Sequence, residues 1–231
     1  MKTAELILVI STLCVILGVI VGCTIKSGEE TTPNADEFSI QQLQEDFIYL
    51  RNQLENNHPK LYLYYPKATF DGFFDEAYAS IDKPMTEAQF FRLIAPIVAR
   101  VKCGHTFIDF SETFKSQRRS NSRLFPLGVV FLNGKAYIYQ NFSRRTDIIM
   151  GTEILSINQT SISSILNRIL NGIPADGNNL TFKHRRIARQ FFQFYFDLVE
   201  APDHFDLRCI APGETGEFTL SIDALSYNEV W

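Results

Sequence analysis

Apolar side chains recur every three or four residues in three consecutive stretches between residues 38 and 103. This spacing predicts three amphipathic helices, each with one buried face. The first follows Ser39 and the third follows Thr86, and each of these residues has a Gln three positions later, the pattern of a capping box. Pro96 interrupts the third pattern and predicts a kink or a restart of that helix. The apolar positions are Ile40, Leu43, Phe47, Leu50 and Leu54, then Phe70, Phe73, Phe74, Ala77, Tyr78 and Ile81, then Phe90, Leu93, Ile94, Ile97, Val98 and Val101.

The third helix is followed by a corner that carries a histidine. The helix is predicted to end at Gly104, because glycine takes the left-handed conformation of a helix C-terminus most easily. His105 comes next, and residues 106–110 then alternate as a strand does. A histidine between a packed helix and a strand is held in place, which suits a catalytic or orienting imidazole. His105 is therefore the candidate catalytic residue, and the alternative is an imidazole that only ties the corner together.

After His105 the hydrophobic period changes from helical to alternating. Residues 125–132 and 136–139 flank Asn133-Gly134-Lys135, which predicts a hairpin. The whole pattern predicts an α+β fold, in which an N-terminal three-helix unit precedes a β-rich module with an inserted long helix. The other predicted elements are a polar loop over 111–123, a strand and turn over 151–158, a helix capped by Ser161, a long aromatic helix over 180–199, and a last hairpin of strands 205–210 and 218–222.

The N-terminus has the features of a secretory signal. Lys2 precedes an apolar run from Leu6 to Val21, which is short for the ~20 residues of a membrane span. The run ends in Ile20-Val21-Gly22-Cys23, which resembles a bacterial lipobox and implies that Cys23 becomes the lipidated first residue. An uncleaved single-span anchor is the alternative. Residues 1–22 are thus predicted to be a signal peptide and residues 23–37 a solvated tether.

Charge and cysteine content narrow the possible functions. A net charge of −4 gives no reason to expect nucleic acid. We find no metal-ligand spacing, phosphate loop or dinucleotide motif, so we predict neither a metal nor another cofactor. Cys103 and Cys209 either form a disulfide in an oxidising compartment or are separately buried. A thiol–imidazole pair of Cys103 with His105 is disfavoured, since neighbours two residues apart at a corner seldom reach each other.

Two segments of the second half resemble a PDZ domain. The residues from Gly151 to Asn158, Gly-Thr-Glu-Ile-Leu-Ser-Ile-Asn, match the family's turn, although Gln159 stands where the family has Gly. Leu127-Gly128-Val129 is similar to the PDZ carboxylate loop, whose backbone N–H groups receive a peptide C-terminus. The resemblance implies that these residues bind an extended peptide at a sheet edge. The alternative is that Gly128 only makes a bulge in an ordinary strand.

The order of these segments resembles the N-terminal half of the C-terminal processing serine peptidases, the tail-specific or tricorn-like proteases. The resemblance rests on the lipobox, Gly151–Asn158, and the short motifs Asn57-His58-Pro59, Met85-Thr86, Gly104-His105-Thr106 and Asp176-Gly177-Asn178-Asn179. It implies that His105 is the general base of the serine. The Ser that precedes this histidine in tricorn-type members is replaced here by Gly104.

The resemblance also implies a domain order and a place in the cell. It implies a helical domain over 38–103, a PDZ-like domain over 104–223, and the start of a catalytic domain over 224–231. The family's nucleophile lies in that later α/β domain, so no nucleophile is assigned here. The expected protein is a lipid-anchored peptidase of the bacterial cell envelope that acts on polypeptides. The alternative is a non-catalytic lipoprotein that binds peptides or a partner protein.

Overall fold

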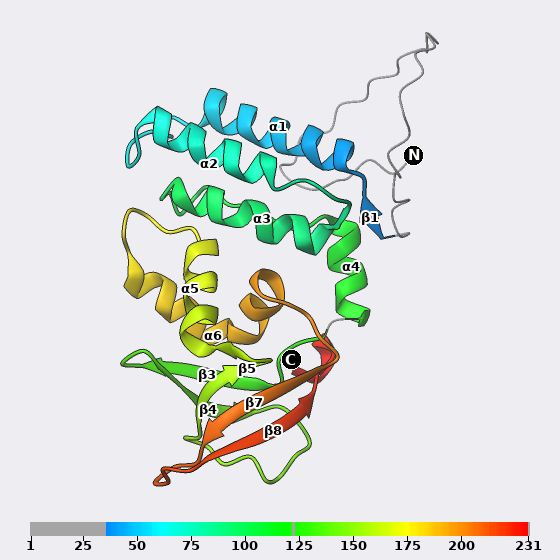
Figure 1. Cartoon of the computed structure of the whole chain (residues 1–231), viewed down its shortest axis with the longest axis vertical. Coiled ribbons are helices and arrows are strands. Elements are labelled where there is room, and N and C mark those ends of the chain that lie inside the picture. The colour runs from blue at the N-terminus through cyan, green and yellow to red at the C-terminus, as the bar shows by residue number, and fades with distance from the viewer. Residues whose placement is uncertain (1–35, 122, 231) are drawn as a thin grey trace.

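The structure, a computed structural model, describes residues 36–121 and 123–230, with the side chains of residues 120 and 121 left aside. Helices α1, α2 and α3 form one end of the molecule, α5 and α6 lie in the middle, and an antiparallel sheet forms the other end (Figure 1). The prediction of an α+β fold is confirmed. The predicted signal peptide, Cys23 and most of the tether lie outside the described residues. No helix within the described residues is long and apolar enough to cross a membrane.

Helices α1 (Ile40–Asn57), α2 (Lys67–Ala79) and α3 (Glu87–Arg100) pack on one another through their apolar stripes. Both predicted capping boxes form, at Ser39 with Gln42 and at Thr86 with Gln89. The short strands β1 (Glu37–Phe38) and β2 (Met85–Thr86) pair beside them. The shared core is built from Leu43, Phe47, Leu50, Leu54, Leu61, Phe70, Phe74, Ala77, Ile81, Met85, Phe90, Ile94, Ile97, Val98 and Val101.

The end of α3 differs from the sequence-based prediction. The helix continues through Pro96 and stops at Arg100, four residues before Gly104. The left-handed residue is Lys102, with φ 56°, and not a glycine. Residues 106–110 are not a strand, because no other strand of the described chain lies beside them to supply a ladder of hydrogen bonds. This segment is instead held by Phe110, whose ring stacks on Phe91 of α3 at 4.1 Å.

The predicted polar loop after residue 110 is a helix, α4 (Glu112–Asn121). Ser111 caps it, since its Oγ accepts a hydrogen bond from the Phe114 N–H at 3.1 Å. Ser111 is in turn fixed by the buried carboxylate of Glu87, which accepts from its N–H at 2.6 Å and from its hydroxyl at 2.8 Å. The partner that stabilises this helix start is 24 residues away, so local sequence did not reveal it.

The larger sheet is antiparallel, with the strand order β3-β4-β5-β7-β8, and β6 pairs with β5. Asn133 and Gly134, with φ of 51° and 78°, turn the first hairpin, as predicted. The last hairpin is also confirmed. The strands are β3 (Leu127–Leu132), β4 (Lys135–Asn141), β5 (Glu153–Ile157), β6 (Thr160–Ser161), β7 (His204–Ile210) and β8 (Glu217–Asp223).

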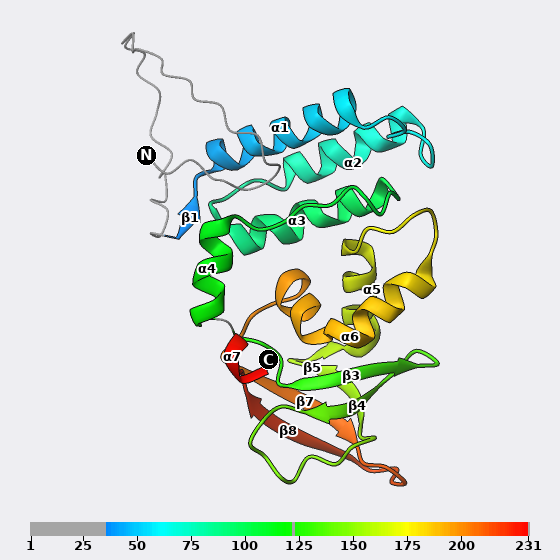
Figure 2. The same ribbon diagram turned by 180° about the vertical axis from the view of Figure 1, so that it is seen from behind.

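Helices α5 (Ile162–Gly172) and α6 (Leu180–Leu198) lie between the sheet and α3, as Figure 2 shows from behind. Ser161 caps α5, as predicted. Helix α6 bends at Gln190, where φ −140° and ψ 35° are not helical. A short helix α7 (Tyr227–Val230) closes the described chain next to α4. These layers enclose a second core centred on Phe125, Phe191, Tyr195 and Phe205.

Candidate functional site

The chain between α3 and α4 is tied to the loop between α5 and α6 at the corner that carries His105. The N–H of Gly177 donates to the carbonyl oxygen of Lys102 at 2.9 Å, and the N–H of Gly104 donates to Asp176 Oδ1 at 2.7 Å. The Lys102 ammonium donates to Asn178 Oδ1 at 2.8 Å. We call Lys102–His105 together with Asp176–Asn178 the histidine corner. These three hydrogen bonds, each between residues more than 70 positions apart, join the two segments, and two of them hold backbone groups.

Aromatic side chains hold the strained residue of this corner. A lysine in the left-handed conformation is strained by about 1–2 kcal/mol, and Lys102 keeps it with φ 56°. Its ammonium lies over the rings of Tyr64, at 5.3 Å, and Tyr65, at 4.9 Å. Gly177 has φ 57°, and a Cβ there would lie 3.1 Å from the Tyr64 hydroxyl. Non-glycine residues held in the left-handed region cluster at functional sites, so this strain supports a functional role for the corner.

His105 is exposed, and its imidazole has no hydrogen-bond partner among the described residues. One ligand atom each of Cys103, His105 and Asp176 lie within 4.8 Å of one another. Cys103 and His105 therefore lie near each other, but among the described residues no hydrogen bond joins the thiol to the imidazole. Asp176 was part of a motif that the resemblance used, but nothing in the sequence linked it to His105. The link arises because the Asp176 carboxylate is anchored on the N–H of Gly104, the residue between Cys103 and His105.

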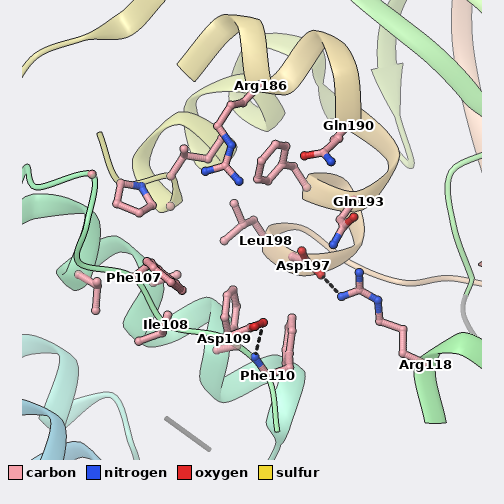
Figure 3. Close-up of a pocket in the computed structure, with 18 residues that line it drawn as sticks. Phe107, Ile108, Asp109, Phe110, Arg118, Arg186, Gln190, Gln193, Asp197 and Leu198 are labelled. Atoms are coloured by element: carbon pink, nitrogen blue, oxygen red, sulfur yellow. Dashed lines mark hydrogen bonds and ion pairs between the residues drawn. The ribbon is translucent and has the colours of Figure 1, made fainter. Parts of the chain in front are cut away.

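Beside this corner lies a cavity of about 420 Å³, between α3, α6 and residues 107–110 (Figure 3). Gly104 and Phe107, on either side of His105, both line it. The guanidinium of Arg186 points into it from α6 (Figure 3). The remaining walls are mainly apolar and come from Phe91, Ala95, Val98, Ile108, Phe110, Gly172, Ile173, Pro174, Phe194 and Leu198, with Gln190, Gln193, Asp109, Asp197 and Arg118 as polar members.

One wall of the cavity contains a nearly buried ion pair. Arg118 of α4 donates to Asp197 Oδ1 at 2.7 Å, and the two side chains are only 10% and 13% exposed. Burial raises the pKa of the Asp197 carboxyl to about 6, and the opposing effect of Arg118 does not cancel it. The Arg118 guanidinium also lies over the ring of Phe196 at 5.0 Å. The pair therefore joins α4 to the end of α6 at the edge of the cavity.

The second predicted site, Leu127-Gly128-Val129, lies in strand β3. The side chains of Leu127 and Val129 are fully buried, and the ladder to β4 shifts its register between Gly128 and Val129. A Cβ on Gly128 would lie 2.9 Å from the Cβ of Gln140, so glycine is needed for close approach of the two strands. Among the described strands, only β4 pairs with β3, which leaves its other edge free of a strand partner.

The segment Gly151–Asn158 forms β5 and a tight turn. Asn158 and Gln159 take left-handed φ angles of 46° and 64°, a conformation that glycine adopts most easily. The Asn158 amide donates to Glu200 at 2.8 Å, and its carbonyl oxygen accepts from the N–H of Asp206 at 2.9 Å. Asn158 therefore joins the turn to the end of α6 and to β7.

The disulfide alternative for Cys103 and Cys209 does not occur in the structure. Both are free thiols, with Cys103 at the corner and Cys209 buried in β7. Burial raises the pKa of the Cys209 thiol to about 11. Cys209 is therefore an unreactive core residue, whereas Cys103 lies beside His105.

The fold and site define an α+β protein whose exposed histidine lies beside a cavity with apolar and charged walls. No family model matches the sequence, and neither does any curated protein. The fold is similar to solved structures of CPAF, a chlamydial serine protease of the tail-specific type. Mature CPAF aligns with a TM-score of 0.51 and 11% identity, and its complex with lactacystin with 0.51 and 12%. Each alignment covers 80% of this chain and 34% of the CPAF chain, so this chain spans about a third of CPAF's length.

Proposed function

We propose that this chain is the N-terminal portion of a lipid-anchored serine endopeptidase of the C-terminal processing family. The observation that carries the proposal is the coincidence of a CPAF-like fold with an exposed histidine on a rigid corner beside a cavity. Because the chain spans 34% of CPAF, the serine nucleophile is proposed to reside in a further domain.

In this proposal, His105 is the general base. Its imidazole takes the proton of the serine hydroxyl as the serine attacks the peptide carbonyl, and then gives that proton to the leaving amine. Such transfer requires a histidine that is accessible and held in position. His105 is exposed, while the backbone beside it is fixed by Asp176 and by the Gly177–Lys102 hydrogen bond. Asp176 acts as a positioning residue, since its carboxylate holds the backbone on which His105 stands.

The proposed substrate is a polypeptide that contacts two surfaces. The cavity takes a large apolar side chain, because its walls are mainly apolar and its 420 Å³ exceed the volume of any single side chain. Arg186 gives it a cation that favours an acidic group next to that side chain. In addition, an extended peptide pairs with the free edge of β3 at Leu127, Gly128 and Val129, as an extra strand held by backbone hydrogen bonds.

Cleavage of an unstructured protein such as casein tests the enzymatic proposal. A longer protein that joins this chain to the proposed serine-bearing domain is expected to cleave casein, with inhibition by a serine-directed reagent. This chain alone is expected to leave casein intact. Inhibitor-sensitive cleavage by this chain alone would contradict the proposal, because it would require a complete catalytic site within these residues.

Lipid anchoring is proposed separately, from the lipobox-like residues that end in Cys23. Metabolic labelling with a radioactive fatty acid is expected to label the wild-type protein in a bacterial host. Cys23→Ala is expected to abolish the label and leave an unprocessed precursor, whereas Cys14→Ala is expected to change neither. Unchanged labelling of Cys23→Ala would refute the anchor.

A second candidate function is peptide binding without catalysis, favoured by the unpaired edge of β3. In that case, the longer protein would bind an extended peptide but leave casein intact. Binding measured by fluorescence anisotropy and cleavage measured on the same preparation distinguish the two functions.

A further inference from the structure

We propose that Cys103, His105 and Asp176 form a binding site for a zinc ion. Thiolate sulfur, imidazole nitrogen and carboxylate oxygen are the three ligand types that proteins offer to Zn²⁺. The three ligands do not form a recognisable metal-binding motif in the sequence, because Cys103 and His105 are separated by one residue and Asp176 follows only much later. The fold brings the three groups to the same corner.

The spacing of the three ligand atoms suits a tetrahedral ion. Bonds of about 2.0–2.3 Å to zinc separate neighbouring ligand atoms by roughly 3.3–3.7 Å. The thiol, imidazole and carboxylate atoms lie within 4.8 Å of one another. The three atoms have to approach one another by at most about 1.5 Å when the ion binds. A water molecule would complete the fourth position, as in zinc sites with three protein ligands.

The surrounding residues also orient the Asp176 carboxylate and leave the Cys103 thiol available to a metal. Asp176 Oδ1 accepts from the Gly104 N–H, and no hydrogen bond from the described residues reaches Oδ2, which remains available to a metal. A hydrogen bond to one oxygen of a ligating carboxylate orients it, as outer-shell partners do in established zinc sites. Cys103 is a free, half-buried thiol. The nearby cation, Lys102, is engaged by Asn178 and by two tyrosine rings.

Binding releases a proton, since Cys103 changes from thiol to thiolate as the S–Zn bond forms and its proton passes to water. The imidazole binds through the lone pair of one ring nitrogen. If His105 is the general base, which rests on the proposed function, that lone pair is then unavailable to the serine proton. Zinc would therefore inhibit the peptidase at its own base.

Cobalt(II) tests the site because it replaces zinc and reports sulfur ligation by its absorption. The protein is the full chain with Cys14→Ser and Cys23→Ser, purified in detergent under reducing conditions, so that only Cys103 and Cys209 remain as thiols. One Co²⁺ per chain is expected to give a sulfur-to-metal charge-transfer band and intense tetrahedral d–d bands, and added Zn²⁺ is expected to remove both. Cys103→Ser should abolish the charge-transfer band, and Asp176→Ala should weaken binding by ~10- to 100-fold.

Three matched variants serve as controls: Cys209→Ser, His184→Ala and His204→Ala should each bind Co²⁺ as the parent protein does. Absence of the charge-transfer band from the folded parent protein, or its persistence in Cys103→Ser, would overturn the zinc site whatever the peptidase activity. In the longer enzyme, zinc at saturating concentration should abolish casein cleavage. Full activity of the zinc-loaded enzyme would overturn the role of His105 as base and leave the metal site standing.

Discussion

The histidine corner and the β3 segment Leu127–Val129, both singled out from the sequence, differ in which of their groups are accessible. At the corner, the backbone is held by hydrogen bonds from a distant loop and the His105 side chain is exposed. In β3, Leu127 and Val129 are buried and only the backbone edge is free. The corner thus offers side-chain chemistry, and the strand offers hydrogen bonds that do not depend on side-chain identity.

This difference separates function from stability in a way that mutations can test. A substitution of an exposed, unpartnered side chain leaves packing intact, whereas a substitution at a close approach of two strands disturbs it. We therefore expect a change of the exposed His105 to alter activity, and a change of Gly128 in β3 to alter the free energy of unfolding.

The largest expected effect is that of His105→Ala on catalysis. If the chain belongs to the proposed peptidase, this change in the longer enzyme should lower the rate of casein cleavage by ~10²–10⁴-fold, because the proposed general base is lost. Its melting temperature should stay within about 1 °C of wild type, since substitutions at exposed, unpartnered positions usually change stability little. His184→Ala, at an exposed position of α6, is the matched control and should keep the full rate. A destabilised His105→Ala protein with an unchanged rate per folded molecule would show that the ring is structural.

The reverse pattern is expected for Gly128→Ala in β3. The new Cβ would lie 2.8 Å from Tyr139 and 2.9 Å from the Cβ of Gln140, and the latter cannot rotate away. Forcing the strands apart should cost ~1–3 kcal/mol and lower the melting temperature by roughly 2–4 °C per kcal/mol. Gly216→Ala is the control, because nothing lies within 4 Å of its added Cβ. Equal melting temperatures for the two variants would contradict the close approach.

Features that depend on residues close in the sequence could be predicted from the sequence, and features that depend on distant residues could not. Capping boxes at Ser39 and Thr86 and the Asn133-Gly134 turn were predicted because each depends on residues three or fewer positions apart. Helix α4 was missed because its start is stabilised by Glu87, far from it in sequence. A strand over 106–110 was predicted from alternation alone, but a strand also needs a neighbouring strand.

The candidate site was predicted only in part. His105 could be singled out because it follows a strongly periodic helix, and helix periodicity is a local signal. Its neighbours in space could not, since Asp176 reaches the corner only through the packing of α5 and α6 against α3. Lys102 in the left-handed conformation was also missed, because sequence favours Gly104 for that role and the tyrosine contacts that hold Lys102 come from residues 64 and 65.

The cavity beside the corner adds a pH-dependent prediction. Burial raises the pKa of Asp197 to about 6, whereas the unfolded carboxyl has a value near 3.8. Between about pH 4 and 6, the folded state therefore holds a proton that the unfolded state has released, and stability from this group falls as pH rises. The charged groups around it are Arg118, Arg92 and Asp109.

Urea unfolding at several pH values measures this effect. The free energy of unfolding of wild type minus that of Asp197→Asn should fall by up to about 2 kcal/mol from pH 4 to pH 6, since only the wild type titrates at this position. A difference that rises with pH over the same range would mean that the Arg118 ion pair, and not burial, controls the carboxyl.

The smallest expected effect is that of removing the carboxylate that holds the corner. Without metal, Asp176→Ala leaves the Gly104 N–H without its acceptor at 2.7 Å and should cost about 0.5–1.5 kcal/mol. The cost is small because Gly104 is exposed and water can replace the lost acceptor. Asp176→Asn keeps an oxygen in the same place and should restore most of the loss in thermal unfolding. Asp82→Ala, an exposed aspartate with no hydrogen bond or ion pair among the described residues, should have no effect. If Asp176→Asn is as unstable as Asp176→Ala, the negative charge and not the hydrogen bond holds the corner, and the backbone account of its rigidity is wrong.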